Sequence, residues 1–327
     1  MRAAYIETLG PPEDIRVGEL ELGPRPPGHT TIAVEHVAVN RVDTLVRSGQ
    51  FRTNLPWPCV LGRDAIGYVT DTDERSDFFP GTRVWTSSLA HDGRQGAAAE
   101  WAHVPDDRLY PAPEGVTGTD LLAVAHPGST AYLAVVRHGR VQPGDRVLIR
   151  GAAGNVGSAA IAIASYLGAS TIVAVASEAH HAACVDNGAT DVVDYTGESA
   201  DDQLATVARR VGGFDLWIDA HGGNNLDAAV ENLRLNGRIV LLAGPASVST
   251  LASGSLYLKD GSVKGFVISR AEPHDLRAAA GLVSLLVARG RLSPVAITYG
   301  ELSDLPRIHR MIEAGELSRT RSVIRVT

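Results

Sequence analysis

A glycine-rich turn between a short apolar run and a long alanine-rich segment constrains this chain more than any other feature. Residues 147–150 read Val-Leu-Ile-Arg, and Gly151, Gly154 and Gly157 follow at intervals of three. Residues 158–167 then continue as an apolar stretch rich in alanine. This order predicts a strand, a tight turn and a buried helix, which is the start of a β-α-β unit.

Strand-like and helix-like segments alternate after this turn. Short runs rich in β-branched residues are separated by longer segments with helical periodicity. Such alternation is typical of a parallel, doubly wound sheet of the Rossmann type, so we expect an α/β domain. The expected strands are 146–150, 171–176, 191–195, 214–220 and 237–243, and the expected helices are 180–187, 200–211 and 225–233.

The first third of the chain has a different character. Residues 1–125 contain short strand-like runs at 31–39, 66–70 and 83–86, separated by clusters of Pro, Gly and Asp. This pattern predicts a compact, barrel-like β domain. Because 327 residues exceed one ordinary core, two domains are expected. We assign residues 126–274 to the Rossmann domain and residues 1–125 to the β-rich domain, completed by 275–327, with a helix near 275–291 and a returning strand at 322–326.

Charge and cysteine usage exclude several classes of function. The formal net charge is −7 and the basic residues are scattered, which disfavours nucleic-acid binding. The sequence has no apolar stretch long enough for a membrane span and no apolar signal segment at its N-terminus. Cys59 and Cys184 are the two cysteines, so a disulfide framework is not expected and a cytoplasmic location is. Only Lys259 and Lys264 among the 30 basic residues are lysines, which is typical of a GC-rich bacterial genome.

The glycine turn predicts a dinucleotide site. Its spacing, G-x-x-G-x-x-G, departs from the usual G-x-G-x-x-G, but a strand precedes it and a helix follows. A tight turn lets the backbone approach a pyrophosphate, and the helix N-terminus offers free N–H groups and a partial positive charge. The residues predicted to contact the cofactor here are Gly151, Ala153, Gly154, Asn155, Val156 and Gly157, with Ala243 and Gly244 after the fifth strand.

The end of the second strand bears on the choice of cofactor. An NAD site usually carries an acidic side chain there, which binds the adenosine ribose diol. This strand ends instead in Ala176 and Ser177, which leaves room for a 2′-phosphate, and His180 follows. We therefore expect NADPH. The alternative is NADH, with Glu178 turned inward to hold the diol.

Residues 39–49, Val-Asn-Arg-Val-Asp-Thr-Leu-Val-Arg-Ser-Gly, resemble the N-x-x-D-x-x-x-R-x-G signature of quinone oxidoreductases, the zinc-free, zeta-crystallin-like branch of the medium-chain dehydrogenase/reductase superfamily. The family's later elements follow in order at 60–69, 128–132, 151–157 and 188–195. The resemblance implies a GroES-like β domain, a Rossmann domain and a cleft between them that holds the nicotinamide. It implies Asn40, Asp43 and Thr130 at the reaction centre, and Ser177, His180, Tyr195 and Arg319 around the 2′-phosphate.

The chain departs from its relatives at several informative positions. Phe51 stands where the family commonly has Tyr, Asp64 stands for a usual Glu, and His180 stands for a frequent Lys. Zinc alcohol dehydrogenases of the same superfamily place Cys at the position of Asn40 and Gly-His-Glu at residues 62–64, which are Gly-Arg-Asp here. No metal is therefore expected, and we interpret His91, His103 and His126 as ordinary polar or core histidines.

Together these features predict an enzyme that transfers a hydride from NADPH to a small electrophile, either a quinone or a conjugated alkene. A biosynthetic tailoring reductase and a non-catalytic nicotinamide sensor remain alternatives. Tyr68, Tyr132, Tyr257 and water are unranked candidates for a proton donor. Strand-like segments at 255–258 and 262–268 predict, by the resemblance, a homodimer formed through a sheet edge.

Overall fold

The computed structural model describes residues 1–197, 200–223 and 225–327. The chain divides into two compact units. Unit 1 comprises Met1–His126 and Glu272–Thr327, and unit 2 comprises Pro127–Ala271. No helix within the described residues has the length and apolar character needed to cross a bilayer.

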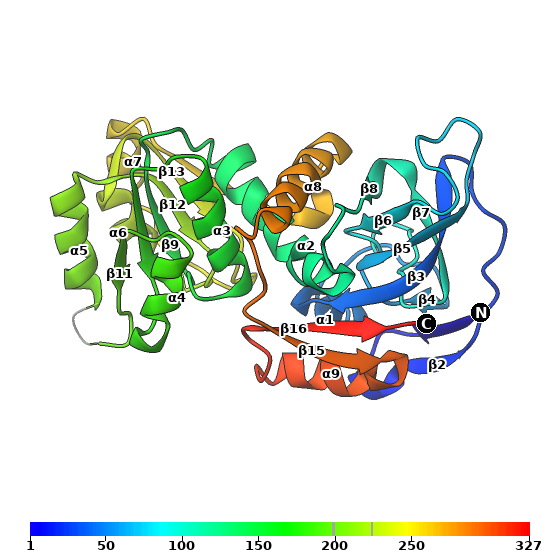
Figure 1. The fold of residues 1–327 in the computed structure, drawn as a ribbon. Helices are drawn as coiled ribbons and strands as arrows, with labels where there is room; N and C mark the ends of the chain where they lie inside the picture. The colour runs from blue at the N-terminus through cyan, green and yellow to red at the C-terminus, as the bar shows by residue number, and fades with distance from the viewer. Residues whose placement is uncertain (198–199, 224) are drawn as a thin grey trace. The chain divides into compact units, whose positions relative to one another are not determined.

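Unit 2 is built on a six-stranded sheet in the order β11-β10-β9-β12-β13-β14, and every neighbouring pair is parallel (Figure 1). The chain starts in the middle at β9, adds β10 and β11 on one side, and then crosses to add β12 to β14 on the other. This is the doubly wound order predicted from the alternating pattern, with its switch point between β9 and β12. The strands are β9 (Arg146–Arg150), β10 (Thr171–Val175), β11 (Asp191–Val193), β12 (Phe214–Asp219), β13 (Leu233–Leu241) and β14 (Ser262–Gly265).

The connections of unit 2 are helical, as crossovers between parallel strands require. Leu148, Val173 and Trp217 are paired across neighbouring strands, so they share one face of the sheet, and their buried side chains belong to one apolar cluster. The helices are α3 (Asn155–Tyr166), α4 (His181–Asp186), α5 (Ala200–Val211), α6 (Leu226–Glu231) and α7 (Ser253–Leu258), with the π-helix η3 (Leu133–His138) and the 3₁₀ turns η4 (Glu178–His180) and η5 (Ile268–Arg270).

One secondary-structure prediction in unit 2 is wrong. The segment 255–258 was expected to be a strand, but it belongs to helix α7. A strand would place Leu256 and Leu258 on one face. In the structure Leu256 packs against the core, whereas Leu258 is 76% exposed. The amide of Leu256 donates to the carbonyl of Ala252, which closes the helical turn. Short apolar runs do not distinguish the two periods, and tertiary packing decided this one.

Unit 1 is organised around the long strand β3 (His29–Val39), which pairs with three others. Strand β16 (Thr320–Arg325), from the end of the chain, lies antiparallel to β3 (Figure 1). The predicted return of the C-terminal tail is therefore confirmed. The sheet has the order β15-β16-β3-β5-β6-β8, with β7 also on β3. Its other strands are β5 (Asp64–Asp71), β6 (Arg83–Thr86), β7 (Trp101–Pro105), β8 (Leu109–Pro111) and β15 (Ala296–Glu301).

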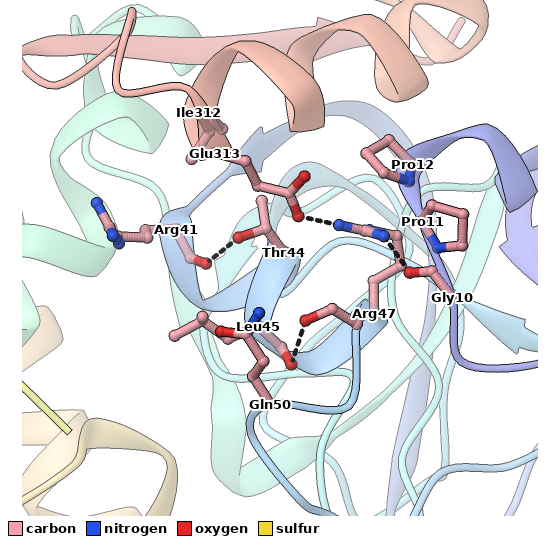
Figure 2. A pocket seen from close by; sticks show the side chains of 11 residues that line it. Gly10, Pro11, Pro12, Arg41, Thr44, Leu45, Arg47, Gln50, Ile312 and Glu313 are labelled. Carbon is pink, nitrogen blue, oxygen red and sulfur yellow. Dashed lines mark hydrogen bonds and ion pairs between the residues drawn. The ribbon is translucent and has the colours of Figure 1, made fainter. Parts of the chain in front are cut away.

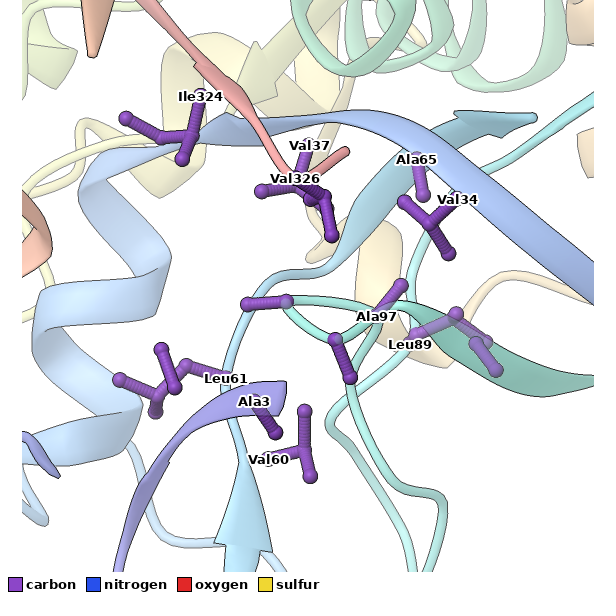
Figure 3. Packing of buried hydrophobic residues seen from close by; sticks show 14 of the residues in the cluster. Ala3, Val34, Val37, Val60, Leu61, Ala65, Leu89, Ala97, Ile324 and Val326 are labelled. Atoms are coloured by element: carbon purple, nitrogen blue, oxygen red, sulfur yellow. The ribbon is translucent and has the colours of Figure 1, made fainter. Parts of the chain in front are cut away.

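A second, three-stranded sheet of unit 1, β2-β1-β4, packs on the same apolar core. Figure 3 shows Ala3, Val60 and Leu61 from this side of the core near Val37 and Val326. All of these side chains are buried, so the core joins the two ends of the sequence. The remaining elements are β1 (Arg2–Ile6), β2 (Arg16–Glu19), β4 (Cys59–Val60), α1 (Arg41–Arg47), α8 (Pro273–Ala288) and α9 (Leu305–Glu313), with turns η1 (Pro12–Asp14), η2 (Asp106–Arg108) and η6 (Leu302–Asp304). Helix α2 (Gly118–Tyr132) contains the division between the units.

Candidate functional site

The glycine turn of unit 2 has the geometry that the sequence predicts. Strand β9 ends at Arg150, and Gly151 has a φ of +72°, a conformation that favours glycine. A Cβ on Gly157 would lie 2.2 Å from the carbonyl oxygen of Gly151. Glycine at position 157 therefore lets the start of α3 lie directly against the turn.

The turn leads into the N-terminus of α3, and the backbone amides of the first helical turn are the groups that it presents. Gly154 is the N-cap residue, and no described side chain caps the helix. The Gly154 amide donates to the Gly151 carbonyl at 3.0 Å, and the Ser158 amide donates to Gly154 at 2.8 Å. Amides in the first turn of a helix have no intrahelical acceptor, and the helix dipole adds partial positive charge there. The turn therefore fits an anionic diphosphate.

The loops after β12 and β13 meet beside this turn, at the switch point of the sheet. The carboxylate of Asp219, the last residue of β12, accepts the amides of His221 and Gly222 at 2.9 Å each. A Cβ on Gly222 would lie 2.6 Å from the amide nitrogen of Gly244. The two loops are thus packed backbone to backbone. Ala243 and Gly244, which the sequence predicts as cofactor contacts, lie in the second of these loops.

Three of the residues predicted around a 2′-phosphate lie at the carboxyl ends of β10 and β11. Ser177 is the N-cap of η4, and His180 is the last residue of that turn. Tyr195 follows the neighbouring strand, is 52% exposed, and stacks obliquely near the His221 ring at 6.1 Å. Arg319 belongs to unit 1, where it directly precedes β16.

A carboxylate also lies at this end of the sheet. Asp194 accepts the amide and the hydroxyl of Thr196 at 2.9 and 2.8 Å. Hydrogen bonds from the Thr196 amide and hydroxyl, together with the charge of His181, lower the pKa of Asp194. This carboxylate is therefore ionised and already engaged by its own turn.

In unit 1, Asn40 and Asp43 form a capping box at the start of α1. Asn40 is the N-cap residue, and its amide donates to the Asp43 carboxylate at 2.6 Å. Both residues are almost fully buried. Reciprocal capping of this kind fixes where a helix begins. It explains why the predicted signature has Asn and Asp three residues apart.

Asn40 is also part of a buried polar network. Its side-chain Nδ2 donates to Asp64 Oδ2 at 2.7 Å, and its Oδ1 accepts from the Arg321 guanidinium. Arg321 donates a second hydrogen bond to the Ala123 carbonyl at 2.8 Å. His126 Nδ1 lies 3.2 Å from Asp64 Oδ2. We call Asn40, Asp64, His126 and Arg321 the buried polar network of unit 1.

The pKa values of two buried carboxyl groups, Asp64 and Asp43, are shifted in opposite directions. Burial alone would raise the pKa of Asp64, but the charge and hydrogen bond of His126, with hydrogen bonds from residues 87 and 88, lower it to about 2. Burial raises the pKa of Asp43 to about 6, against the opposing charge of Arg63. Burial lowers the pKa of Arg321, and Asp64 and Asp43 oppose that shift. Asp64 is thus the permanently ionised centre of the network.

Three members of this network were missed as functional candidates from the sequence. Asp64 was noted only as a departure from the family, His126 was interpreted as an ordinary histidine, and Arg321 was not considered. A signal existed for Asp64, since Arg63 and Asp64 interrupt an otherwise apolar stretch and charged pairs are rarely buried without partners. Nothing local marks Arg321, whose partners lie 281 and 198 residues away.

A cavity of about 530 Å³ lies on unit 1 between α1, the turn before η1 and the end of α9 (Figure 2). Figure 2 shows the Arg47 guanidinium between the Gly10 carbonyl and the Glu313 carboxylate, to both of which it donates. Arg47 is buried, so its charge is matched by these contacts. The arginine of the predicted signature therefore ties three segments of unit 1 together.

Within the described part of the chain, no group of three or more His, Cys, Asp or Glu residues could hold a metal ion. At the positions where zinc relatives carry ligands, the structure has the amide of Asn40 hydrogen-bonded on both sides and the fully buried cation Arg63. A guanidinium supplies no lone pair to a metal. These residues do not fit a zinc site.

Comparison with known proteins identifies the family. Residues 26–114 match the model of the alcohol dehydrogenase GroES-like domain, and residues 155–305 match that of the zinc-binding dehydrogenase. Mouse quinone oxidoreductase is 28% identical over 96% of this chain and 95% of its own length. Mouse quinone oxidoreductase-like protein 2 is 32% identical over 84% of this chain and 77% of its own.

The chain belongs to the quinone oxidoreductase, zeta-crystallin-like branch of the medium-chain dehydrogenase/reductase superfamily. The predicted fold class, a Rossmann domain with a GroES-like domain, is confirmed. A crystal structure described as an NAD-dependent alcohol dehydrogenase is 26% identical, covers all of both chains and superposes with a TM-score of 0.86. The quinone oxidoreductase family is a family of oxidoreductases that bind a nicotinamide cofactor.

Proposed function

We propose that this quinone oxidoreductase relative is an NADPH-dependent reductase of quinones or conjugated alkenes that works without a metal. The choice of NADPH rests on the residues at the carboxyl end of β10. Ser177 stands there, and the carboxylate of the neighbouring Asp194 is engaged by Thr196. A diol would lack its usual acidic partner at this strand end, whereas a 2′-phosphate would meet a hydroxyl and the His180 imidazole.

When bound, the reduced nicotinamide supplies a hydride to an electrophilic carbon or oxygen of the substrate. The residues of the chain bind and orient the cofactor and the substrate. The first-turn amides of α3 hold the diphosphate, and the glycines at 151 and 157 let it approach the backbone. In unit 1, the side-chain amide of Asn40 accepts a hydrogen bond from Arg321 and donates one to Asp64, so its orientation is fixed.

The donor set of unit 1 supports the choice of substrate. Quinones and conjugated alkenes accept a hydride without a Lewis acid, whereas an unactivated ketone or alcohol gains much from one. Asn40 and Arg63 stand where zinc relatives place ligands, and they do not fit a metal. An acceptor that is already electrophilic matches this site best.

Two measurements test the cofactor choice. Ser177→Asp is expected to weaken NADPH binding by about tenfold or more, because a carboxylate would repel the 2′-phosphate, while NADH binding is weakened less. Glu178→Gln is the matched test of the alternative, since Glu178 is the exposed acid that could hold a diol. A wild type that prefers NADH, together with weakened NADH binding in Glu178→Gln, would overturn the NADPH proposal.

Turnover is tested by stopped-flow oxidation of NADPH with a panel of quinones and enones. Reduction of several members supports the proposed function. Turnover restricted to one elaborate enone indicates a biosynthetic tailoring reductase instead. Tight NADPH binding with no acceptor in the panel indicates a sensor, because fold and cofactor site do not by themselves establish turnover.

We also propose that the protein is a homodimer formed at the edge of the unit 2 sheet. β14 is the edge strand, and the adjacent α7 exposes Tyr257 by 79% and Leu258 by 76%. An unprotected edge beside apolar side chains is a surface that proteins usually cover. Light scattering should give twice the mass of 34.4 kDa, and Leu258→Asp should yield monomer. A monomeric wild type at micromolar concentration contradicts the proposal.

A further inference from the structure

Unit 1 contains two arginines that are buried near each other without a carboxylate partner. Arg108, the last residue of η2, is 8% exposed, and its Nη1 atom is buried without a hydrogen-bond partner among the described residues. Arg94 is half-buried, and its Nε atom is likewise buried and has no partner in the described part of the chain. Burial and then the positive charge of Arg108 lower the pKa of Arg94. The two guanidinium groups therefore lie near enough to repel each other.

The acids around this pair do not neutralise it. The charges of Asp92 and Asp107 oppose that of Arg108 at Arg94, but both acids are exposed. Within residues 1–197, 200–223 and 225–327, no carboxylate forms an ion pair with Arg94 or Arg108. Charged side chains are rarely buried unless they are paired, because an unpaired buried charge is costly. The described part of unit 1 thus holds two cations without supplying their anion.

Tyr110 adds a hydroxyl donor beside Arg108. The pairing of β6 with β8 sets Trp85 opposite Tyr110, and their rings lie 5.0 Å apart. Tyr110 is 4% exposed, and its hydroxyl is buried without a partner among the residues that the structure describes. Burial raises the pKa of Tyr110, and the charge of Arg108 opposes that shift. The hydroxyl therefore keeps its proton at neutral pH and can donate it to a hydrogen bond.

His91 shows that the positive charge is concentrated at this place. The amide of Arg94 donates to the carbonyl of His91 at 3.2 Å, so the two residues form one turn. Burial, followed by the charges of Arg63 and Arg94, lowers the pKa of His91 to about 4. Arg108 acts on the same ring in the same sense. His91 is therefore neutral at pH 7, and the guanidinium groups around it create a field that attracts anions.

We propose that Arg94, Arg108 and the Tyr110 hydroxyl form a binding site for a small oxyanion, a carboxylate or a phosphate group. Each of their buried atoms without a partner carries a hydrogen, and a guanidinium has no acceptor, so the ligand supplies acceptors and negative charge. Planar guanidinium groups bind carboxylate and phosphate through paired hydrogen bonds. Arg94 is partly exposed, and Gly93 beside it is exposed, so an ion reaches the pair from solvent. The site lies within unit 1 and is independent of the reductase function proposed above.

Isothermal titration calorimetry tests the site with inorganic phosphate and with succinate at pH 7. Both titrations are run at one ionic strength, set with sodium chloride, so that screening of surface charges is equal. At least one of the two probes should bind saturably, with one ion per chain. Binding of succinate alone identifies a carboxylate site, and binding of phosphate alone identifies a phosphate site. If neither probe binds, the proposal is overturned.

Variants assign the binding to the named groups. Arg108→Met should weaken binding of the probe by about tenfold or more, because charge-assisted hydrogen bonds are lost. Tyr110→Phe keeps the ring contact with Trp85 and should weaken binding by about threefold. Arg291→Met is the matched control, since Arg291 is exposed in unit 1, and it should bind the probe as wild type does. Saturable binding that persists unchanged in both Arg108→Met and Tyr110→Phe places the ion elsewhere and contradicts the proposal.

Stability separates a ligand-binding arginine from a structural one. Without the probe, Arg108→Met should unfold at the same urea concentration as wild type or at a higher one, because an apolar side chain replaces a buried cation that has no partner. The probe should raise the wild-type midpoint and leave that of Arg108→Met unchanged. An Arg108→Met variant that is less stable than wild type by the same margin with and without the probe assigns Arg108 a structural role and overturns the proposal. Neither measurement involves a nicotinamide, so a protein without reductase activity would still be tested fully.

Discussion

The guanidinium of Arg321 donates to the side-chain oxygen of Asn40, although 281 residues separate them in the sequence. The last strand of the chain thereby holds the residue that begins α1. Asn40 in turn donates a hydrogen bond to Asp64, and the positive charge of Arg321 is balanced by Asp64 and Asp43. Asn40 is thus fixed from three separate segments of unit 1.

Arg321→Met should destabilise the protein strongly. The change removes a buried cation that interacts with the charges of Asp64 and Asp43, and it leaves the buried oxygens of Asn40 and Ala123 without their donor, which costs about 3–5 kcal/mol in comparable cases. The matched control is Arg325→Met on the same strand, whose partner Glu301 is exposed. That exposed pair should contribute less than about 1 kcal/mol. Urea unfolding at pH 7 measures both, and equal shifts of the two midpoints would contradict the argument.

The fold of unit 2 could be predicted from the sequence because its strands and helices are marked by residues close to them in the chain. Every strand of a β-α-β unit is bounded by its own turn, and the order of crossovers follows from the handedness and shortness of connections. Glycine at position 157 is required by contacts with Gly151 and Ala152, which lie within six residues of it, and Gly151 by its own positive φ of +72°. Helix α7 was not predicted because a four-residue segment is too short to distinguish helical from strand periodicity. The packing of Leu256 on the core determines that this segment is helical.

The network of unit 1 could not be predicted in the same way. Its hydrogen bonds span 24, 62, 198 and 281 residues. Each member is ordinary in its own stretch of sequence: a histidine in a helix, an arginine in a terminal strand. They become neighbours because β16 pairs with β3, which brings Arg321 to the N-cap of α1. Family resemblance predicts Asn40 at the reaction centre, but it carries no information on the hydrogen-bond partners that this chain supplies to Asn40.

Gly157→Ala should abolish most of the cofactor affinity. The added Cβ would lie 2.2 Å from the Gly151 carbonyl oxygen and 2.7 Å from Cα of Ala152, both backbone atoms that cannot rotate away. The start of α3 must shift, and the amides proposed to hold the diphosphate shift with it. We expect NADPH to bind about tenfold or more weakly, a loss of about 1.4 kcal/mol or more.

The matched control is Gly281→Ala, in the middle of α8, where a Cβ would meet nothing within 4 Å. Alanine there should be neutral or should stabilise the helix by up to about 1 kcal/mol, with unchanged NADPH binding. Fluorescence titration with NADPH measures both variants. Equal affinities for Gly157→Ala and wild type would show that the turn is not where the diphosphate binds.

Lys259 should contribute to the stability of unit 2 through its three hydrogen bonds. Its ammonium group donates to the carbonyls of Val230, Glu231 and Leu233 at 2.8, 2.6 and 2.7 Å, and so caps the C-terminal end of α6. A cation is favoured at that end of a helix. Lys259→Met should lower the free energy of unfolding by about 1–3 kcal/mol. An unfolding midpoint that stays within error of wild type would show that water replaces the ammonium group without loss.

His309 makes the stability of unit 1 sensitive to acid. It is almost fully buried in α9, and burial together with the charge of Arg47 lowers its pKa to about 3. In the unfolded chain a histidine titrates near 6.5, so below that pH the unfolded state binds more protons than the folded state. Stability from this group is complete above pH 6.5 and is lost as the pH falls toward 3. The loss amounts to about 2 kcal/mol by pH 5.

His309→Leu should remove that dependence. The Nδ1 atom of His309 is buried and has no hydrogen-bond partner among the described residues, so an apolar side chain of similar size should fit at neutral pH with little cost. Urea midpoints at pH 7 and pH 5 should differ less for the variant than for wild type. His274→Gln, which removes an exposed histidine, should keep the wild-type difference. If His309→Leu loses as much stability on acidification as wild type does, the sensitivity belongs to other groups, with the buried carboxyl groups near Asn40 as the next to be tested.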